Sequence, residues 1–89
     1  MNEHKDLIDN TLRLKAIDRL FSEISHYNTI YDFNYWWRIE PAYGYEFYLT
    51  NRVISACFDI TNTDSILKAV SFVKQRETDL DEQRKRTGE

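Results

Sequence analysis

The sequence predicts an α+β domain made of a helix, a three-stranded antiparallel meander and a second helix. Two observations predict it: apolar residues recur about every 3.6 positions near both ends of the chain, and every second position in between. One face of the predicted sheet is uniformly apolar, and two helices can cover only one face. We therefore expect a single domain over residues 1–89, with both helices on that face.

The first helix is expected at about residues 3–27. When residues are placed at intervals of about 100° around a helix, the apolar side chains of this segment gather on one half of the cylinder. They are Leu7, Leu14, Ile17, Leu20, Phe21, Ile24 and Tyr27. Ile8 and Leu12 lie beyond the edge of this stripe, and Asn28-Thr29 ends the pattern.

Three strands are expected at about residues 30–40, 44–50 and 53–61, where β-branched and aromatic residues are enriched. Pro41 and Gly44 mark the first turn, and Asn51 marks the second. The alternation assigns one set of side chains to the covered face. They are Tyr31, Phe33, Tyr35, Trp37, Ile39, Tyr45, Phe47, Leu49, Ile54, Ala56, Phe58 and Ile60.

The alternation also favours one register, with a three-residue loop at 41–43 and a two-residue turn at Asn51-Arg52. On the covered face it pairs Ile39 with Tyr45, Trp37 with Phe47, Tyr35 with Leu49, Leu49 with Ile54, Phe47 with Ala56, and Tyr45 with Phe58. On the opposite face it places Arg38 beside Glu46, Trp36 beside Tyr48 and Asn34 beside Thr50. Such cross-strand pairs contribute roughly 0.2–1 kcal/mol each.

The second helix is expected at about residues 63–86. Asn62 or Thr63 can cap its start, and Asp64 in the first turn is favoured by the helix dipole. Beyond Val73 the segment is almost entirely charged, so we expect its end to fray into solvent. The apolar stripe of this helix consists of Ile66, Ala69, Val70, Val73 and Leu80.

Composition and charge exclude several functional classes. The formal net charge is -3 and no segment is basic, so the electrostatic attraction expected of a nucleic-acid or anionic-membrane binder is missing. No apolar run reaches the roughly 20 residues that span a bilayer, and the polar, acid-containing N-terminus does not resemble a secretory signal. Cys57 is the single cysteine and cannot form an internal disulfide, which fits the cytoplasmic location that we expect.

Aromatic and charged residues together predict a partner-binding site on the uncovered face. Trp36 and Tyr48 point outward in this register. Aromatic residues ringed by charges are typical of protein-contact hot spots. The surrounding residues are Arg38, Glu40, Glu46, Val53 and Asp59. In the alternative interpretation Trp36 is covered by the flank of the first helix, by the C-terminal tail or by a second copy. Homodimerisation through this face is compatible with both interpretations.

A nucleic-acid-binding module is a second alternative, because exposed rings on a sheet can stack on bases. The helix–three-strand–helix order also resembles that of double-stranded-RNA-binding domains. Those domains carry a lysine cluster at the start of the second helix, whereas NTDSILKAV contains only Lys68. Arg38 and Arg52 are the only bases in the predicted sheet, too few for strong phosphate neutralisation.

No pattern of catalytic or metal-ligating residues is present. His4 and His26 lie about six turns apart on one predicted helix, and no histidine is placed to activate Cys57. Cys57 is expected to face outward beside Glu46. The carboxylates Glu40, Glu46 and Asp59 could approach one another near the end of the sheet, but a solvated acidic rim explains them equally well. We therefore expect no enzymatic activity, no cofactor and no metal.

The sequence as a whole favours a small protein-binding module that acts by contact. Small, acidic, cofactor-free domains of this kind are common among inhibitors encoded by mobile elements, such as anti-CRISPR and other anti-defence proteins, antitoxins and immunity proteins. The expected mechanism is steric occlusion of a partner protein, with acidic residues opposite a basic surface on that partner.

Overall fold

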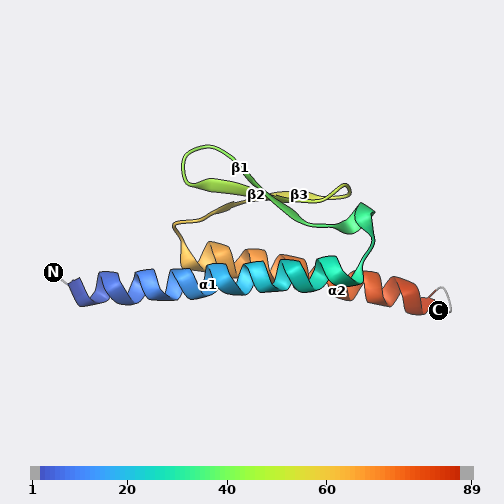
Figure 1. Cartoon of the computed structure of the whole chain (residues 1–89), viewed down its shortest axis with the longest axis horizontal. Coiled ribbons are helices and arrows are strands. Elements are labelled where there is room, and N and C mark those ends of the chain that lie inside the picture. The colour runs from blue at the N-terminus through green and yellow to red at the C-terminus, as the bar shows by residue number, and fades with distance from the viewer. Residues whose placement is uncertain (1–2, 87–89) are drawn as a thin grey trace.

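The fold is described by a computed structural model that covers residues 3–86, with side chains for residues 7–86. The elements are α1 (Glu3–Ile30), a 3₁₀ turn (Phe33–Tyr35), β1 (Arg38–Pro41), β2 (Glu46–Thr50), β3 (Ser55–Asp59) and α2 (Thr63–Arg86). The three strands form one antiparallel sheet in the order β1-β2-β3. Both helices lie on the same face of this sheet (Figure 1), which confirms the predicted α+β architecture.

The two helices run side by side in the same direction (Figure 1). The hydroxyl of Tyr31, just after the end of α1, donates to Asp81 Oδ1 of α2 at 2.7 Å, across 50 positions in the sequence. One turn earlier, His26 Nε2 lies 3.6 Å from Glu77 Oε1. Because α2 starts only at Thr63, this offset leaves the first turns of α1 without a helical neighbour among residues 3–86.

Both helices supply the core, but only the stripe of α2 was predicted in full. Its five apolar residues are all buried, and Asn62 Oδ1 caps α2 by accepting from the Ser65 N–H at 3.2 Å. In α1 the buried residues are Ala16, Leu20, Ile24 and Tyr27. The prediction is wrong for Leu7, Leu14 and Phe21, which are 63%, 56% and 55% exposed because they lie on the flank of α1 or ahead of α2.

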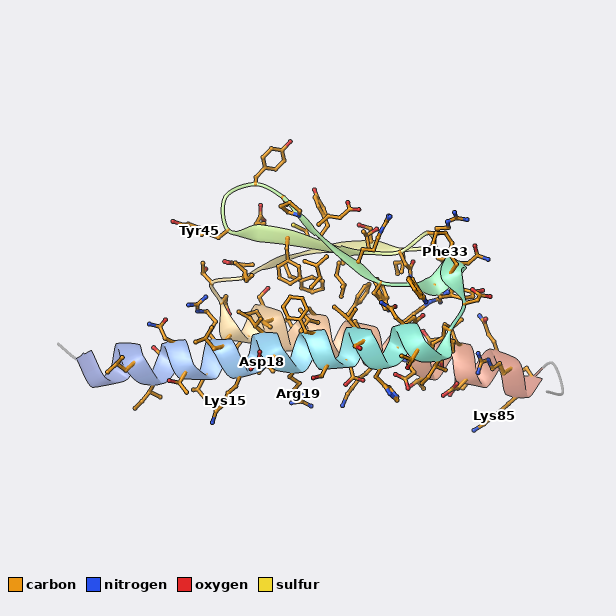
Figure 2. All side chains as sticks on the ribbon, in the orientation of Figure 1. Lys15, Asp18, Arg19, Phe33, Tyr45 and Lys85 are labelled. Carbon is orange, nitrogen blue, oxygen red and sulfur yellow. The ribbon has the colours of Figure 1, made fainter. Side chains whose placement is uncertain are left out.

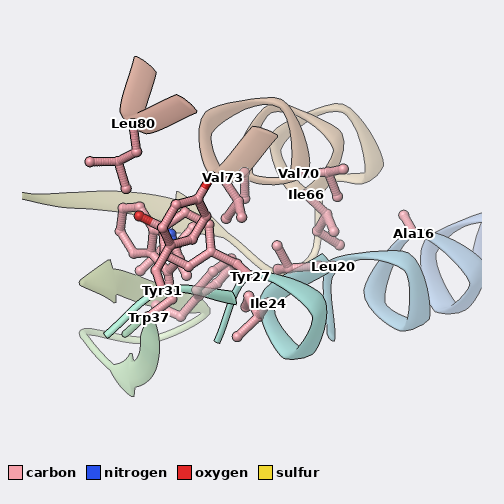
Figure 3. Close-up of a cluster of buried hydrophobic side chains, with 13 residues drawn as sticks. Ala16, Leu20, Ile24, Tyr27, Tyr31, Trp37, Ile66, Val70, Val73 and Leu80 are labelled. Carbon is pink, nitrogen blue, oxygen red and sulfur yellow. The ribbon is translucent and has the colours of Figure 1, made fainter. Parts of the chain in front are cut away.

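Aromatic rings connect the helices to the sheet. Figure 3 shows Tyr27, Tyr31 and Trp37 gathered at one end of the core, close to Leu80. The ring centroids of Tyr27 and Tyr31 are 4.6 Å apart, and Trp37 lies 5.9 Å from Tyr27 and 5.5 Å from Phe72 of α2. Such contacts add about 0.5–1.5 kcal/mol each beyond simple burial. Trp37, from the segment before β1, thus joins both helices.

The first strand is much shorter than expected. Residues 31–37 do not pair with β2, because two side chains satisfy their backbone in other ways. Asp32 Oδ1 accepts from the Asn34 N–H at 3.0 Å and caps the 3₁₀ turn. Asn28 Oδ1 accepts from the Trp37 N–H at 2.9 Å, and Asn28 Nδ2 donates to the Trp37 carbonyl at 3.1 Å. The side chain of Asn28 therefore takes the place of a strand partner for Trp37. Asn28 also does not end α1, which continues to Ile30.

The strand register is shifted by an even number of residues in both pairs. Ile39 lies opposite Leu49 and not Tyr45, and Leu49 lies opposite Ala56 and not Ile54. The predicted pairs are wrong because both turns are longer than expected. The turn at 42–45 contains Gly44 at φ +60°, and the turn at 51–54 is closed by an Asn51 N–H···O=C Ile54 bond of 2.9 Å. An even shift keeps side chains on the predicted face, so the inward assignment of Phe47, Leu49, Ala56 and Phe58 is correct.

The two buried tyrosines predict a loss of stability at alkaline pH. Burial, partly offset by Arg76, raises the pKa of Tyr27 from 10.0 to about 12. Burial and then the bond to Asp81 raise the pKa of Tyr31. Both phenols ionise more easily in the unfolded chain, so their contribution to stability is complete below about pH 10 and falls as the pH rises above it. The contribution of Tyr27 is lost as the pH rises through about 12. We expect the free energy of unfolding in urea titrations to fall over this interval.

Single tyrosine-to-phenylalanine variants test whether these two phenols cause the loss of stability at alkaline pH. Tyr27→Phe and Tyr31→Phe should each make the decline between about pH 10 and 12 shallower, because each removes one ionising group. Tyr43→Phe, at a ring that is 82% exposed, is the matched control. Equal slopes for the parent chain and both core variants would contradict the assignment.

Candidate protein-binding face

The sheet surface turned away from the helices, here called the outer face, is open to solvent. Its side chains come from alternate strand positions: Arg38 and Glu40 of β1, Glu46, Tyr48 and Thr50 of β2, and Ser55, Cys57 and Asp59 of β3. Among the described residues 3–86, no element lies over this surface (Figure 1). Tyr48 is 39% exposed at its centre, with Glu40 opposite on β1 and Cys57 opposite on β3.

Trp36 is exposed, as predicted, but it does not lie opposite Tyr48. It follows the 3₁₀ turn, ahead of β1, because residues 31–37 are not part of the strand. Its indole is 47% exposed and contacts the ring of Phe33, with centroids 6.2 Å apart. The predicted aromatic pair is therefore wrong, and the two rings occupy different parts of the same surface.

Arg38 joins the outer face to a cleft at its end. This cleft, here called the aromatic–arginine cleft, is lined by Phe33, Trp36, Arg38, Asn51 and Arg52. The predicted pair of Arg38 with Glu46 is wrong, because Thr50 lies opposite Arg38 and Arg38 Nη2 lies 3.5 Å from Glu40 Oε1. Both side chains of this ion pair are more than half exposed, so it contributes little stability. Val53, 56% exposed, lies next to Arg52 in the β2–β3 turn.

Two asparagines hold the cleft segment in place. Asn28 binds the backbone of Trp37 from α1, and Asn51 Nδ2 donates to the Tyr35 carbonyl at 3.4 Å. Asn51 is 7% exposed, and its Oδ1 accepts from the Val53 and Ile54 N–H groups at 2.8 and 2.9 Å. The backbone that carries Phe33 and Trp36 is therefore held by α1 on one side and by the β2–β3 turn on the other.

Phe33 and Arg52 were missing from the predicted site. The alternation assigned Phe33 to the covered face, but it is 62% exposed. Arg52 stacks on it, with the guanidinium carbon 4.5 Å from the ring centre, and Arg52 Nη1 donates to Asn34 Oδ1 at 3.3 Å. The sequence signal that could have revealed this arrangement is the Asp32-x-Asn34 pattern, which favours a side-chain-capped turn over a strand.

The opposite end of the outer face is acidic and carries further exposed rings. Glu46 and Asp59 face each other across β2 and β3. The Asp59 carboxylate accepts from the Thr61 hydroxyl and N–H at 2.6 and 2.8 Å, and these bonds lower its pKa. Tyr43 and Tyr45 are 82% and 72% exposed in the β1–β2 turn, although Tyr45 was predicted to be covered. Figure 2 shows Tyr45 and Phe33 at opposite ends of the sheet.

The described residues do not assemble a recognisable catalytic or metal centre. Desolvation and then the neighbouring Glu46 carboxylate raise the pKa of Cys57, so this exposed thiol is held in its less nucleophilic form. His26 lies on the helical layer beside Glu77, away from the sheet. The side chain of His4 lies outside those that the structure describes. Within the described part of the chain, no group of three or more His, Cys, Asp or Glu residues is placed to hold a metal ion.

Comparisons with known proteins add no assignment: no family model, no curated protein and no solved structure matches the chain. Neither helix of the described segment has the length and apolar character that crossing a membrane requires.

Proposed function

We propose that this chain is a non-enzymatic protein-binding module that uses its outer face to occlude a working surface of a partner protein. The supporting observation is that both helices lie on one side of the sheet, while Tyr48, Trp36 and Val53 remain 39%, 47% and 56% exposed on or beside the other. In this proposal the module belongs to the contact inhibitors, which include anti-defence proteins, antitoxins and immunity proteins.

The size of the sheet indicates that the contact extends beyond the strands. Strands of four or five residues at about 3.4 Å each, and three strands at about 4.8 Å spacing, give an outer face of at most about 250 Å² in projection. A stable interface buries about 800 Å² on each partner. The proposed contact therefore includes the aromatic–arginine cleft at one end and the turn with Tyr43 and Tyr45 at the other.

Charge is separated along this extended surface. Arg38 and Arg52 lie at the cleft end, and Glu46 and Asp59 lie at the turn end. A partner that presents a basic patch to Glu46 and an acidic one to the arginines would meet complementary charges at both ends, and the charges would fix the orientation of the complex.

Capture from a host-cell lysate tests the proposal. The full chain is immobilised and bound proteins are identified by mass spectrometry. We expect one dominant protein, and we expect Tyr48→Ala or Trp36→Ala to reduce its capture about tenfold or more, because each removes an exposed ring from a contact hot spot. Arg19→Ala, on the side of α1 that points away from the sheet (Figure 2), is the matched control and should capture as the parent does.

The variants must retain the fold for this comparison. Both rings are at least 39% exposed, so circular-dichroism melting curves should remain close to that of the parent. Capture that is equally strong in Tyr48→Ala and Trp36→Ala, with intact melting curves, would exclude the outer face as the binding surface. Absence of any protein specific to the parent chain would exclude the function itself.

A further inference from the structure

The aromatic–arginine cleft has the size of a pocket for a single side chain. Its volume is about 110 Å³, and its walls are Phe33, Trp36, Arg38, Asn51 and Arg52. Pockets for cofactors and drug-sized ligands start at about 300 Å³, so this cleft has little more than a third of that volume. One amino-acid side chain fits this volume, and a nucleotide does not.

The chemistry of the walls favours a carboxylate. Two arginines, Arg38 and Arg52, line the cleft, and no acidic residue is among its lining residues. Guanidinium groups bind carboxylates through paired, charge-assisted hydrogen bonds. The Arg38 contact to Glu40 is long and exposed, so an incoming carboxylate can compete with it. Within the described part of the chain, Arg52 contacts the Phe33 ring and the Asn34 amide, and neither group carries a negative charge.

The rim of the cleft favours an apolar neighbour beside that carboxylate. Phe33 and Trp36 are 62% and 47% exposed, and their rings meet at an interplanar angle of 45°. Asn28 and Asn51 fix the backbone that carries both rings, so little ordering is required when a ligand binds. A ring pair on a fixed backbone, next to two cations, is complementary to an acidic residue with an aliphatic or aromatic residue adjacent to it.

We propose that the aromatic–arginine cleft recognises an acidic peptide segment of the partner protein, with an Asp or Glu side chain between Arg38 and Arg52 and an adjacent apolar side chain on Phe33 and Trp36. The inference rests on the proposed function, since it names the chemistry of the surface that the module contacts. It also distinguishes the two ends of the outer face, because Glu46 and Asp59 at the other end require a basic counterpart.

Selection from a random peptide library displayed on phage, with the full chain as bait, tests this recognition. We expect the selected peptides to share an Asp or Glu next to an apolar residue. The strongest peptide is then synthesised in two forms, with the acid and with the corresponding amide. The amide form should bind about tenfold more weakly, because it loses a charge-assisted interaction. Binding is followed by the NMR shift of the exposed Trp36 indole N–H, with the buried Trp37 indole as internal reference.

Arginine variants assign the effect to the cleft. Arg38→Gln and Arg52→Gln should each reduce the difference between the acid and amide peptides, and the double variant should abolish it. Arg19→Gln, an exposed arginine on the far side of α1, should preserve it. Rising salt should weaken binding of the acid peptide but not of the amide peptide.

Several results would overturn the inference. These are the absence of acid-dependent peptide binding, acid-dependent binding that survives in the double variant, and single-stranded RNA that binds the cleft through the same arginines. Self-association that depends on Arg38 and Arg52 would show that the acids of a second copy are the ligand instead. The cleft assignment and the proposed function can fail independently. Capture that depends on Tyr48 but on neither arginine would support the outer face as the binding surface and would overturn only the cleft assignment.

Discussion

Trp37→Ala is expected to lower the free energy of unfolding by about 3–5 kcal/mol. Trp37 is 2% exposed and lies among Tyr27, Phe72 and the covered side of the sheet. Its removal leaves a cavity that both helices border. Domains of this size have total stabilities of about 5–15 kcal/mol, and 1 kcal/mol shifts the melting temperature by about 4–8 °C. The variant should therefore melt at least about 12 °C below the parent.

Trp36→Ala is the matched comparison, because it removes the neighbouring indole from an environment that is 47% exposed. We expect it to cost less than about 1 kcal/mol. Urea titrations followed by circular dichroism measure both values. The two environments would be wrongly assigned if Trp36→Ala were the more damaging change, or if the two variants had equal stability.

Asn51→Ala is expected to lower the free energy of unfolding by about 2–3 kcal/mol. Its side chain accepts from the N–H groups of Val53 and Ile54 and donates to the carbonyl of Tyr35, at a site that is 7% exposed. Alanine leaves these backbone groups without that partner. The turn and the 3₁₀ segment should both loosen, and Trp36 should become more mobile as a consequence.

Asn34→Ala is the control for Asn51→Ala, because its amide is exposed and, among the described residues, accepts from Arg52 alone. Its expected cost is below about 0.5 kcal/mol. Amide hydrogen exchange at Val53 and Ile54 provides a local readout, and we expect it to accelerate in Asn51→Ala alone. Unchanged exchange in that variant would mean that the Asn51 side chain does not hold the turn.

The sequence predicts the fold well because its strongest signals concern burial. The stripe of α2 is interrupted by few polar residues, and each of its five apolar positions is in the core. The inward strand residues also retain their face, since the two register errors are even. The spacing of apolar residues along the chain determines these features, and this spacing does not depend on which residues lie opposite one another in the sheet.

The candidate site is less predictable, because it depends on side-chain hydrogen bonds to the backbone. Alternation of aromatic residues continues through 31–37, yet Asp32 and Asn28 bind the backbone there and prevent strand pairing. As a result Phe33 and Arg52 meet over the 3₁₀ turn, and Trp36 is separated from Tyr48. Asparagine and aspartate side chains can bind backbone groups that would otherwise pair with a neighbouring strand. The periodicity of apolar residues gives no sign of such bonds.

The parallel helix pair also constrains how this chain folds. Tyr31 finds its partners Glu77 and Asp81 only after the whole meander has been made, since 46 and 50 positions separate them. During synthesis the apolar side of α1 therefore lacks its contacts with α2 until that helix emerges from the ribosome. Closing such long loops slows folding, so partly folded chains with exposed apolar surface persist for longer and are prone to aggregate. Truncation within α2 should consequently yield a species that aggregates or binds chaperones, rather than a smaller stable domain.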